Sequence, residues 1–203
     1  MNLAEEIVSR YTYQDYLDWH DDQRWELIDG QAWNMTPAPS FKHQRLAGAI
    51  YRIIANALVG KKCIAGIAPT DIVLSDHDVV QPDVFVVCDK KKITDQVING
   101  APEIVIEVLS PATALKDRRE KKRLYEKFGV REYLLVDPVG RMVERFLLEA
   151  DGTWDKGELF GPDQTVTFIC LPDLCVNLAE VFEADEPEAQ PRPPRSTPAG
   201  PHG

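Results

Sequence analysis

The sequence has no hydrophobic run long enough to span a membrane, and its opening residues, Met1–Glu6, form neither a basic stretch nor an apolar one. These absences argue against a secretory signal and a membrane anchor, and they predict a cytosolic protein with no membrane partner. The sequence also lacks a Cys-x-x-Cys pair, because its four cysteines, Cys63, Cys88, Cys170 and Cys175, are scattered along the chain. We therefore expect reduced structural thiols and no zinc site.

Two common catalytic patterns are missing as well. The chain has no glycine-rich loop of the kind that cradles the phosphates of a nucleotide. Ser110 has no histidine or lysine placed nearby in the sequence to activate it. These absences argue against a nucleotide-binding loop and a serine nucleophile.

Positive charge is scarce. The formal net charge of the 203-residue chain is −10, which argues against strong nonspecific binding to nucleic acid. Two local basic patches remain, at 90–92 and at 116–123. The second patch could contact phosphates, or it could be the solvated face of a helix, and the sequence leaves both interpretations open.

Ionisable residues interrupt two apolar segments that have the character of buried strands. Asp83 opens the run Val84–Val87, and Glu107 lies inside the run Ile104–Leu109. A buried carboxylate without a partner is costly. If the two strands are neighbours, however, both carboxylates can converge on a cation such as Mg²⁺, which prefers oxygen ligands.

The segment after the second strand predicts a helix. Ser110-Pro111 closes the strand, and the composition of Ala112–Phe128 favours helix up to Gly129. At about 100° per residue, Asp117 and Lys121 fall within the apolar arc of this helix, so Lys121 points toward the sheet. The alternative is that Asp117 and Lys121 form an ordinary ion pair at i, i+4 spacing.

These residues belong to a longer ordered series of sequence phrases. The series consists of Trp25–Gly30, Pro39-Ser40 with His43, Pro82-Asp83, Glu107–Pro111, Asp117, Lys121, Tyr125, Gly129–Tyr133 and Val136–Pro138. It resembles the Uma-two family of restriction-endonuclease-like proteins in the PD-(D/E)XK nuclease superfamily, and the similarity extends to about Phe182. The short superfamily motif alone is a weak signal, whereas the ordered series is specific.

The resemblance implies an α/β fold, with a restriction-endonuclease-like mixed β-sheet core flanked by helices. It also implies a metal-dependent endonuclease that hydrolyses DNA phosphodiester bonds. In this interpretation Asp83 and Glu107 hold Mg²⁺ or Mn²⁺, and the backbone carbonyl of Val108 is a further ligand. The superfamily lysine expected two residues after Glu107 is replaced by Leu109, and the resemblance implies that Lys121 is its migrated substitute.

Two other residues enter through the same resemblance. Glu26 is a candidate additional catalytic carboxylate near the metal, although an exposed strand residue would look the same from sequence. His43 could contact the site or the substrate, but a hydrogen bond in the cap region of its helix is the favoured interpretation.

Two other functions stay open. A noncatalytic binding or interaction protein that retains the nuclease fold is favoured by the acidic composition and by Leu109. A metal-dependent hydrolase of another phosphate ester is the third hypothesis. DNA is therefore an expected partner only through the resemblance, and a homodimer is compatible with a sequence that does not specify oligomeric state.

The chain divides into one domain at residues 1–184 and a Pro-rich acidic tail at residues 185–203, which has no apolar periodicity and should be disordered. Within the domain we expect a short helix after Thr12, a hairpin turning at Asp29-Gly30 and a helix from Ser40 to Gly60.

The second half of the domain should contain a parallel crossover. The strand of Glu107, the helix at 112–128 and the strand Glu132–Val136 form one strand–helix–strand unit. We interpret Ser75–Asp78 as a solvated turn and Asp89–Gly100 as a polar connection.

Overall fold

The computed structural model describes residues 10–20, 23–35 and 38–183, so the predicted tail at 185–203 lies outside the described residues. The helical elements are α1 (Tyr13–Leu17), α2 (Phe41–Ala57), η1 (Lys90–Lys92, a 3-10 turn), α3 (Ala114–Lys116), η2 (Asp117–Lys121, a π-helical turn), α4 (Lys122–Lys127) and α5 (Leu178–Glu183). Within the described ranges, no helix combines the length and apolar character that crossing a membrane requires.

The strands form three sheets. They are β1 (Trp25–Ile28), β2 (Gln31–Asn34), β3 (Ile64–Ile67), β4 (Asp71–Ser75), β5 (Asp78–Val80), β6 (Val84–Val87), β7 (Val97–Asn99), β8 (Ile104–Val108), β9 (Glu132–Asp137), β10 (Met142–Leu147), β11 (Glu158–Phe160), β12 (Thr165–Thr167) and β13 (Cys175–Asn177). The largest sheet has the order β11-β10-β9-β8-β6-β3, and a smaller sheet has the order β2-β1-β5-β4-β7. β12 and β13 form a separate pair.

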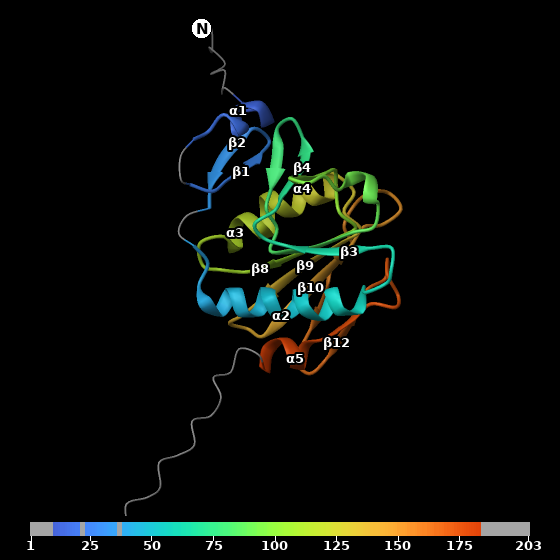
Figure 1. The fold of residues 1–203 in the computed structure, drawn as a ribbon. Helices are drawn as coiled ribbons and strands as arrows, with labels where there is room; N and C mark the ends of the chain where they lie inside the picture. Colours follow the sequence, from blue (N-terminus) through green and yellow to red (C-terminus); the bar gives the residue numbers. More distant parts are fainter. Residues whose placement is uncertain (1–9, 21–22, 36–37, 184–203) are drawn as a thin grey trace, which may run out of the picture.

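The centre of the six-stranded sheet is the predicted crossover unit. β8 and β9 are parallel, and the chain between them forms α3, η2 and α4. β6 pairs antiparallel with β8 on the other side, so the sheet is mixed (Figure 1). This arrangement confirms the predicted mixed sheet, and it makes the strands of Asp83 and Glu107 neighbours.

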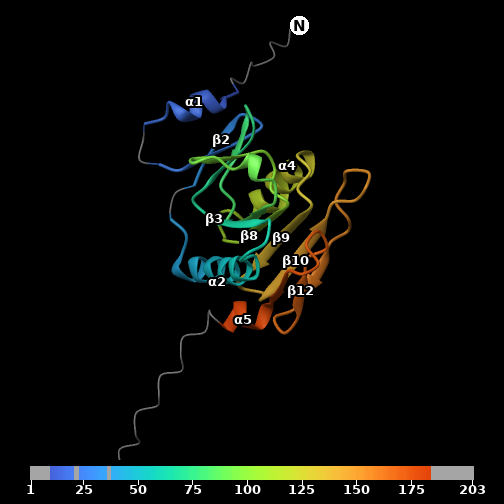
Figure 2. The same cartoon turned by 45° about the vertical axis from the view of Figure 1, so that its right-hand side comes forward.

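The five-stranded sheet packs next to this centre. Figure 2 shows β2 and α1 above the six-stranded sheet, on the side where α4 lies. The predicted hairpin is confirmed, because β1 and β2 pair antiparallel and their turn residues, Asp29 and Gly30, have φ of 50° and 74°. The hairpin is the part of the small sheet that contributes Glu26 to the site.

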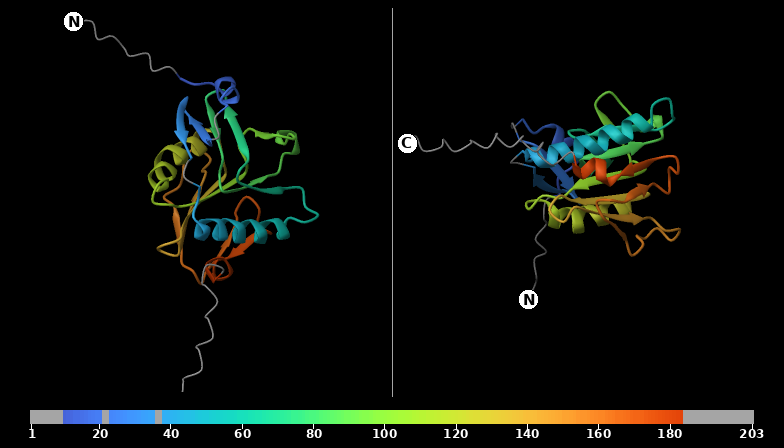
Figure 3. Two further views of the ribbon diagram at one scale, coloured as in Figure 1. Left: turned by 60° about the vertical axis from the view of Figure 1, so that its left-hand side comes forward. Right: turned by 90° about the horizontal axis from the view of Figure 1, so that it is seen from below.

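The alternation of side chains along β8 divides the core into two layers. Ile104, Ile106 and Val108 face the layer built with α2 and α5, whereas Val105 faces the layer that contains α4. The two views of Figure 3 show α2 and α4 on opposite sides of the sheet. Glu107 has the same parity as Val105, so its side chain points toward α4 and the small sheet.

The helix α2 begins where the sequence predicts. The Ser40 hydroxyl accepts a hydrogen bond from the backbone N–H of His43 at 3.2 Å, which caps the first turn. The helix ends at Ala57, three residues before Gly60, whose φ is 74°. The cap places His43 in the first turn, at the end of α2 near the candidate site.

Three predictions are wrong, one about two of the cysteines and two about loops. Cys63 and Cys88 form a disulfide, because the pairing of Ile64 with Val87 places the two cysteines opposite each other at the next position. Cys170 and Cys175 are free thiols, as predicted.

Asp78 is not part of a solvated turn, because its buried carboxylate accepts hydrogen bonds from the Asp29 backbone N–H and the Ser75 hydroxyl, both at 2.7 Å. The polar connection at 89–100 contains the strand β7, which pairs in parallel with β4. Both errors have the same cause, since the partner that buries each segment is distant in the sequence.

Candidate active site: a buried cluster of carboxylates and lysines

Asp83 and Glu107 meet at one end of the paired strands β6 and β8. Asp83 directly precedes β6, and its Oδ2 accepts a hydrogen bond from the backbone N–H of Val108 at 2.8 Å. The backbone N–H of Asp83 lies 3.4 Å from Glu107 Oε2. The backbone therefore holds the two carboxylates side by side, as the apolar runs around them predicted.

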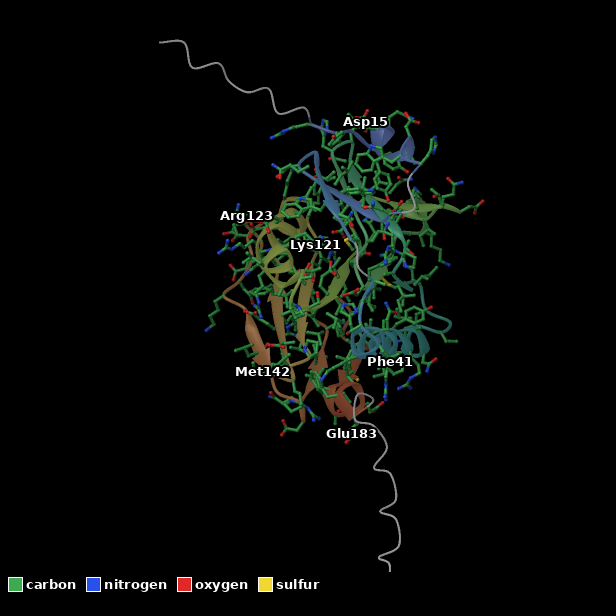
Figure 4. All side chains as sticks on the ribbon, turned by 90° about the vertical axis from the view of Figure 1, so that its left-hand side faces the viewer. Asp15, Phe41, Lys121, Arg123, Met142 and Glu183 are labelled. Carbon is green, nitrogen blue, oxygen red and sulfur yellow. A yellow bond between two sulfur atoms is a disulfide. The ribbon has the colours of Figure 1, made fainter. Side chains whose placement is uncertain are left out.

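Lys121 reaches this pair from the crossover helix. Its Nζ lies 2.8 Å from Glu107 Oε1 and 2.7 Å from Glu26 Oε1, and its side chain is only 2% exposed. In Figure 4 Lys121 lies toward the interior, whereas Arg123 lies on the outer side of the helix. The predicted orientation of Lys121 toward the sheet is confirmed, and its main partners are carboxylates on two strands.

Asp117 is a weaker partner of Lys121, since its Oδ1 lies 3.9 Å from Nζ. The i, i+4 pair that the sequence left open therefore exists, but it is the longest of the three contacts to Lys121.

Glu26 is part of the cluster rather than an exposed strand residue. It is completely buried, and its Oε1 also accepts a hydrogen bond from the backbone N–H of Gln81 at 2.9 Å. Its second oxygen, Oε2, lies 2.7 Å from Nζ of Lys116. Glu26 is therefore bound by two lysines, one on each carboxylate oxygen.

Two tyrosines close the inner side of the cluster. Tyr125 donates its hydroxyl hydrogen to Glu107 Oε1 at 2.8 Å, and Tyr133 donates to the backbone carbonyl of Asp117 at 3.0 Å. Both tyrosines are fully buried. Each buried hydroxyl thus has a hydrogen-bond acceptor in the core, and Glu107 Oε1 accepts from both Tyr125 and Lys121.

His43 contacts the site, which corrects the favoured interpretation. Its Nε2 lies 3.1 Å from Asp83 Oδ2, while its backbone N–H makes the predicted cap contact with Ser40. Burial by itself would lower the pKa of His43, but the hydrogen bond and negative charge of Asp83 outweigh it and raise the pKa. His43 therefore orients Asp83 from the first turn of α2.

Burial and neighbouring charges set the protonation of the cluster. Burial, reinforced by the charges of Asp117, Asp83 and Glu26, raises the pKa of Glu107 to about 8, although Lys121 opposes the shift. Burial would also raise the pKa of Glu26, but its two lysines reverse the direction and lower it. Burial would lower the pKa of Lys121, but the carboxylates raise it well above its usual value. The lysines thus favour the anion of Glu26, whereas Glu107 and Asp117, whose pKa burial also raises, bind a proton more readily than exposed carboxylates do.

The donor atoms suit a magnesium ion. Within the described ranges, no three His, Cys, Asp or Glu side chains form a group that could hold a metal ion. Mg²⁺ does not need such a group, because it is usually bound through one or two carboxylates and keeps several waters. Asp83 and Glu107 provide two adjacent carboxylates, and the Asp83 side chain is 17% exposed, so the pair fits a hard cation that arrives from solvent.

Comparison with known proteins places the chain in a family. The model of the Uma2 family, described as "putative restriction endonuclease", matches residues 13–179. The chain belongs to the Uma2 family. It is 31% identical over 145 residues to a Synechocystis protein described as uncharacterized protein slr1290, covering 70% of this chain and 76% of that protein.

The fold is also similar to a solved structure. A crystal structure from Anabaena variabilis, titled a putative nuclease belonging to DUF820, superposes with a TM-score of 0.71. It shares 20% identity and covers 86% of this chain and 99% of its own. The restriction-endonuclease-like fold predicted from the sequence is thereby confirmed for this Uma2 protein.

Two contacts in the site were not predicted from the sequence. The backbone N–H of Val108 binds Asp83, whereas the metal contact predicted for its carbonyl stays a prediction. Lys116 was missed altogether, because ideal helical spacing separates it from Lys121 by about 140° around the axis. The only available signal was its place at the start of the basic patch.

Proposed function

We propose that this Uma2 protein is a metal-dependent endonuclease that hydrolyses DNA phosphodiester bonds. The observation that supports it most is the meeting of Asp83 and Glu107 at the ends of adjacent strands, with Lys121 2.8 Å from Glu107. Membership in the Uma2 family, described as "putative restriction endonuclease", supports DNA as the substrate in this proposal. The acidic composition implies weak nonspecific attraction to DNA, so binding should depend on specific contacts.

Asp83 and Glu107 would hold Mg²⁺ or Mn²⁺, with the Val108 carbonyl as a third donor. A divalent ion bound there would polarise the phosphate and lower the pKa of a water molecule. His43 and the Val108 backbone N–H fix the orientation of Asp83, because both bind its Oδ2. These contacts leave the ligand carboxylate preorganised before substrate binds.

Lys121 and Tyr125 position Glu107 from the opposite side. Both bind Glu107 Oε1, so Oε2 is turned toward Asp83. Lys121 also supplies positive charge that can stabilise charge developing on the phosphate in the transition state. Glu26 holds Lys121 in place through Oε1, and in this proposal it acts as a positioning residue behind the ligands.

The test is cleavage of plasmid, linear and single-stranded DNA with Mg²⁺ or Mn²⁺. The parent protein should cleave at least one substrate, and Asp83→Asn and Glu107→Gln should abolish cleavage while remaining folded by circular dichroism. Glu149→Gln is the matched control, because Glu149 is an exposed carboxylate outside the cluster. Absence of cleavage in the parent on every substrate would contradict the proposal and favour a noncatalytic binding protein.

A further inference from the structure

Lys116 is a buried lysine at the edge of the cluster. Its Nζ lies 2.7 Å from Glu26 Oε2 and 3.4 Å from Met35 Sδ, and it lies 5.9 Å from the centroid of the Trp33 ring. Its side chain is 8% exposed, compared with 2% for Lys121 and none for Glu26. Both lysines that bind Glu26 are buried, and Lys116 is the less deeply buried of the two.

The two lysines differ in how their donors are used. An ammonium group has three hydrogens to donate. Lys121 faces three carboxylates, at 2.7 Å to Glu26, 2.8 Å to Glu107 and 3.9 Å to Asp117. Among the residues that the structure describes, Lys116 meets one carboxylate, and its second neighbour is a thioether sulfur, which is a weak acceptor. Lys116 therefore retains capacity to bind a further anion.

The π-helical turn explains why both lysines reach the same carboxylate. In an α-helix, positions five residues apart point in different directions, about 140° apart. A π turn instead closes its hydrogen bonds between residues five apart. Lys116 is the residue before η2 and Lys121 is its last residue, so the wider turn aligns them over Glu26. Such turns occur frequently at functional sites.

We propose that Lys116 is a second lysine of the site, which pairs with a phosphate oxygen of the bound strand, while Lys121 holds Glu26 and Glu107 in position. This role rests on the proposed nuclease function. The contact is an ion pair and a hydrogen bond, with no change in covalent structure. It gives the site a second positive group, at the less deeply buried side of Glu26, which helps an acidic protein to hold a polyanion.

The experiment measures DNA binding and cleavage with the same variants. Binding of a 20-base-pair duplex is measured without divalent cations at several KCl concentrations, and cleavage is measured with Mg²⁺. For Lys116→Gln the slope of log affinity against log salt should fall in magnitude by about one, because one phosphate contact is lost. Cleavage, as kcat/KM, should fall about 100-fold. Lys116→Arg should restore the salt slope, because it keeps the charge.

Lys91→Gln is the matched control, since Lys91 is an exposed lysine on η1. Urea unfolding checks the fold of each variant, and Lys116→Met replaces Lys116→Gln if the amide destabilises the protein. If the parent cleaves DNA but Lys116→Gln has the salt slope and kcat/KM of Lys91→Gln, the role of Lys116 is refuted and the nuclease proposal stands. If the parent shows no cation-dependent cleavage, both proposals fail.

Discussion

Replacing Lys121 by methionine should destabilise the protein strongly. The substitution keeps much of the side-chain volume and removes the ammonium group, which lies within 2.8 Å of one oxygen on each of two buried carboxylates, Glu26 and Glu107. Removal of one partner from a buried ion pair costs about 3–5 kcal/mol, because the other charge is left without compensation.

Two features of the cluster place the expected loss at about 3 kcal/mol at pH 7, the lower end of that range. Lys116 stays 2.7 Å from Glu26, so this carboxylate keeps one cation. Glu107, whose pKa burial raises to about 8, can take up a proton instead of remaining as an unpaired anion. At pH 9 the parent can hold ionised Glu107 beside Lys121, whereas the variant must keep Glu107 protonated or leave its charge unpaired, so the loss should increase with pH.

Urea unfolding at pH 6, 7 and 9, followed by circular dichroism, measures this loss. Lys91→Met is the control, because Lys91 is exposed and should change stability by less than about 0.5 kcal/mol. The double variant Glu107→Gln/Lys121→Met should lose less than the sum of the two single variants, since the two residues contact each other. A loss below about 1 kcal/mol for Lys121→Met, or a loss that decreases with pH, would refute this account of the cluster.

Three other predictions concern protonation, the disulfide and packing. Burial raises the pKa of Glu107 to about 8, so Mn²⁺ must displace a proton there, and its affinity by calorimetry should rise about tenfold per pH unit up to pH 8 and then level off. Replacing Cys63 and Cys88 by serine should cost about 3.5 kcal/mol in urea unfolding, because the disulfide closes a loop across a separation of 25 residues. Gly66→Ala should cost about 1–3 kcal/mol, because the new Cβ would lie 2.1 Å from the Phe85 ring.

The three predictions are checked by the pH profile of Mn²⁺ affinity, by Cys175→Ser and by Gly48→Ala. A flat affinity profile between pH 6 and 9 would contradict the protonated state of Glu107. Cys175→Ser removes an exposed free thiol and should leave stability unchanged. If Cys175→Ser loses as much stability as the Cys63 and Cys88 double replacement, the loss in the double replacement is not due to the disulfide. Gly48→Ala has open space around its Cβ in α2 and should not destabilise, which separates steric overlap from a general effect of replacing glycine.

Local signals predicted the parts of the fold that depend on neighbouring residues. The Asp29-Gly30 turn, the Ser40 cap and the crossover from β8 to β9 each follow from a few adjacent residues, and all three are present. Asp83 and Glu107 could be singled out because each interrupts an apolar strand, where a charge requires a partner. The long-range pairing of β6 with β8 then brings them together.

Features that depend on distant partners or irregular geometry could not be predicted. The Cys63–Cys88 disulfide follows from the β3–β6 register, and sequence spacing does not contain that register. The π-helical turn breaks the 100° rule, so Lys116 could not be placed beside Lys121 by counting residues. The burial of Glu26 was equally hidden, because the second sheet that covers it is assembled from distant strands.

The most direct test of the central claim is a crystal structure of the protein soaked in Mn²⁺, with anomalous diffraction recorded to locate the ion. Asp83 and Glu107 are predicted to share one anomalous peak within coordination distance of both carboxylates, and Glu107→Gln crystals soaked in parallel should lack it. Absence of a peak at these carboxylates in the parent, under conditions in which calorimetry shows Mn²⁺ binding, would contradict the assignment of this cluster as the metal site.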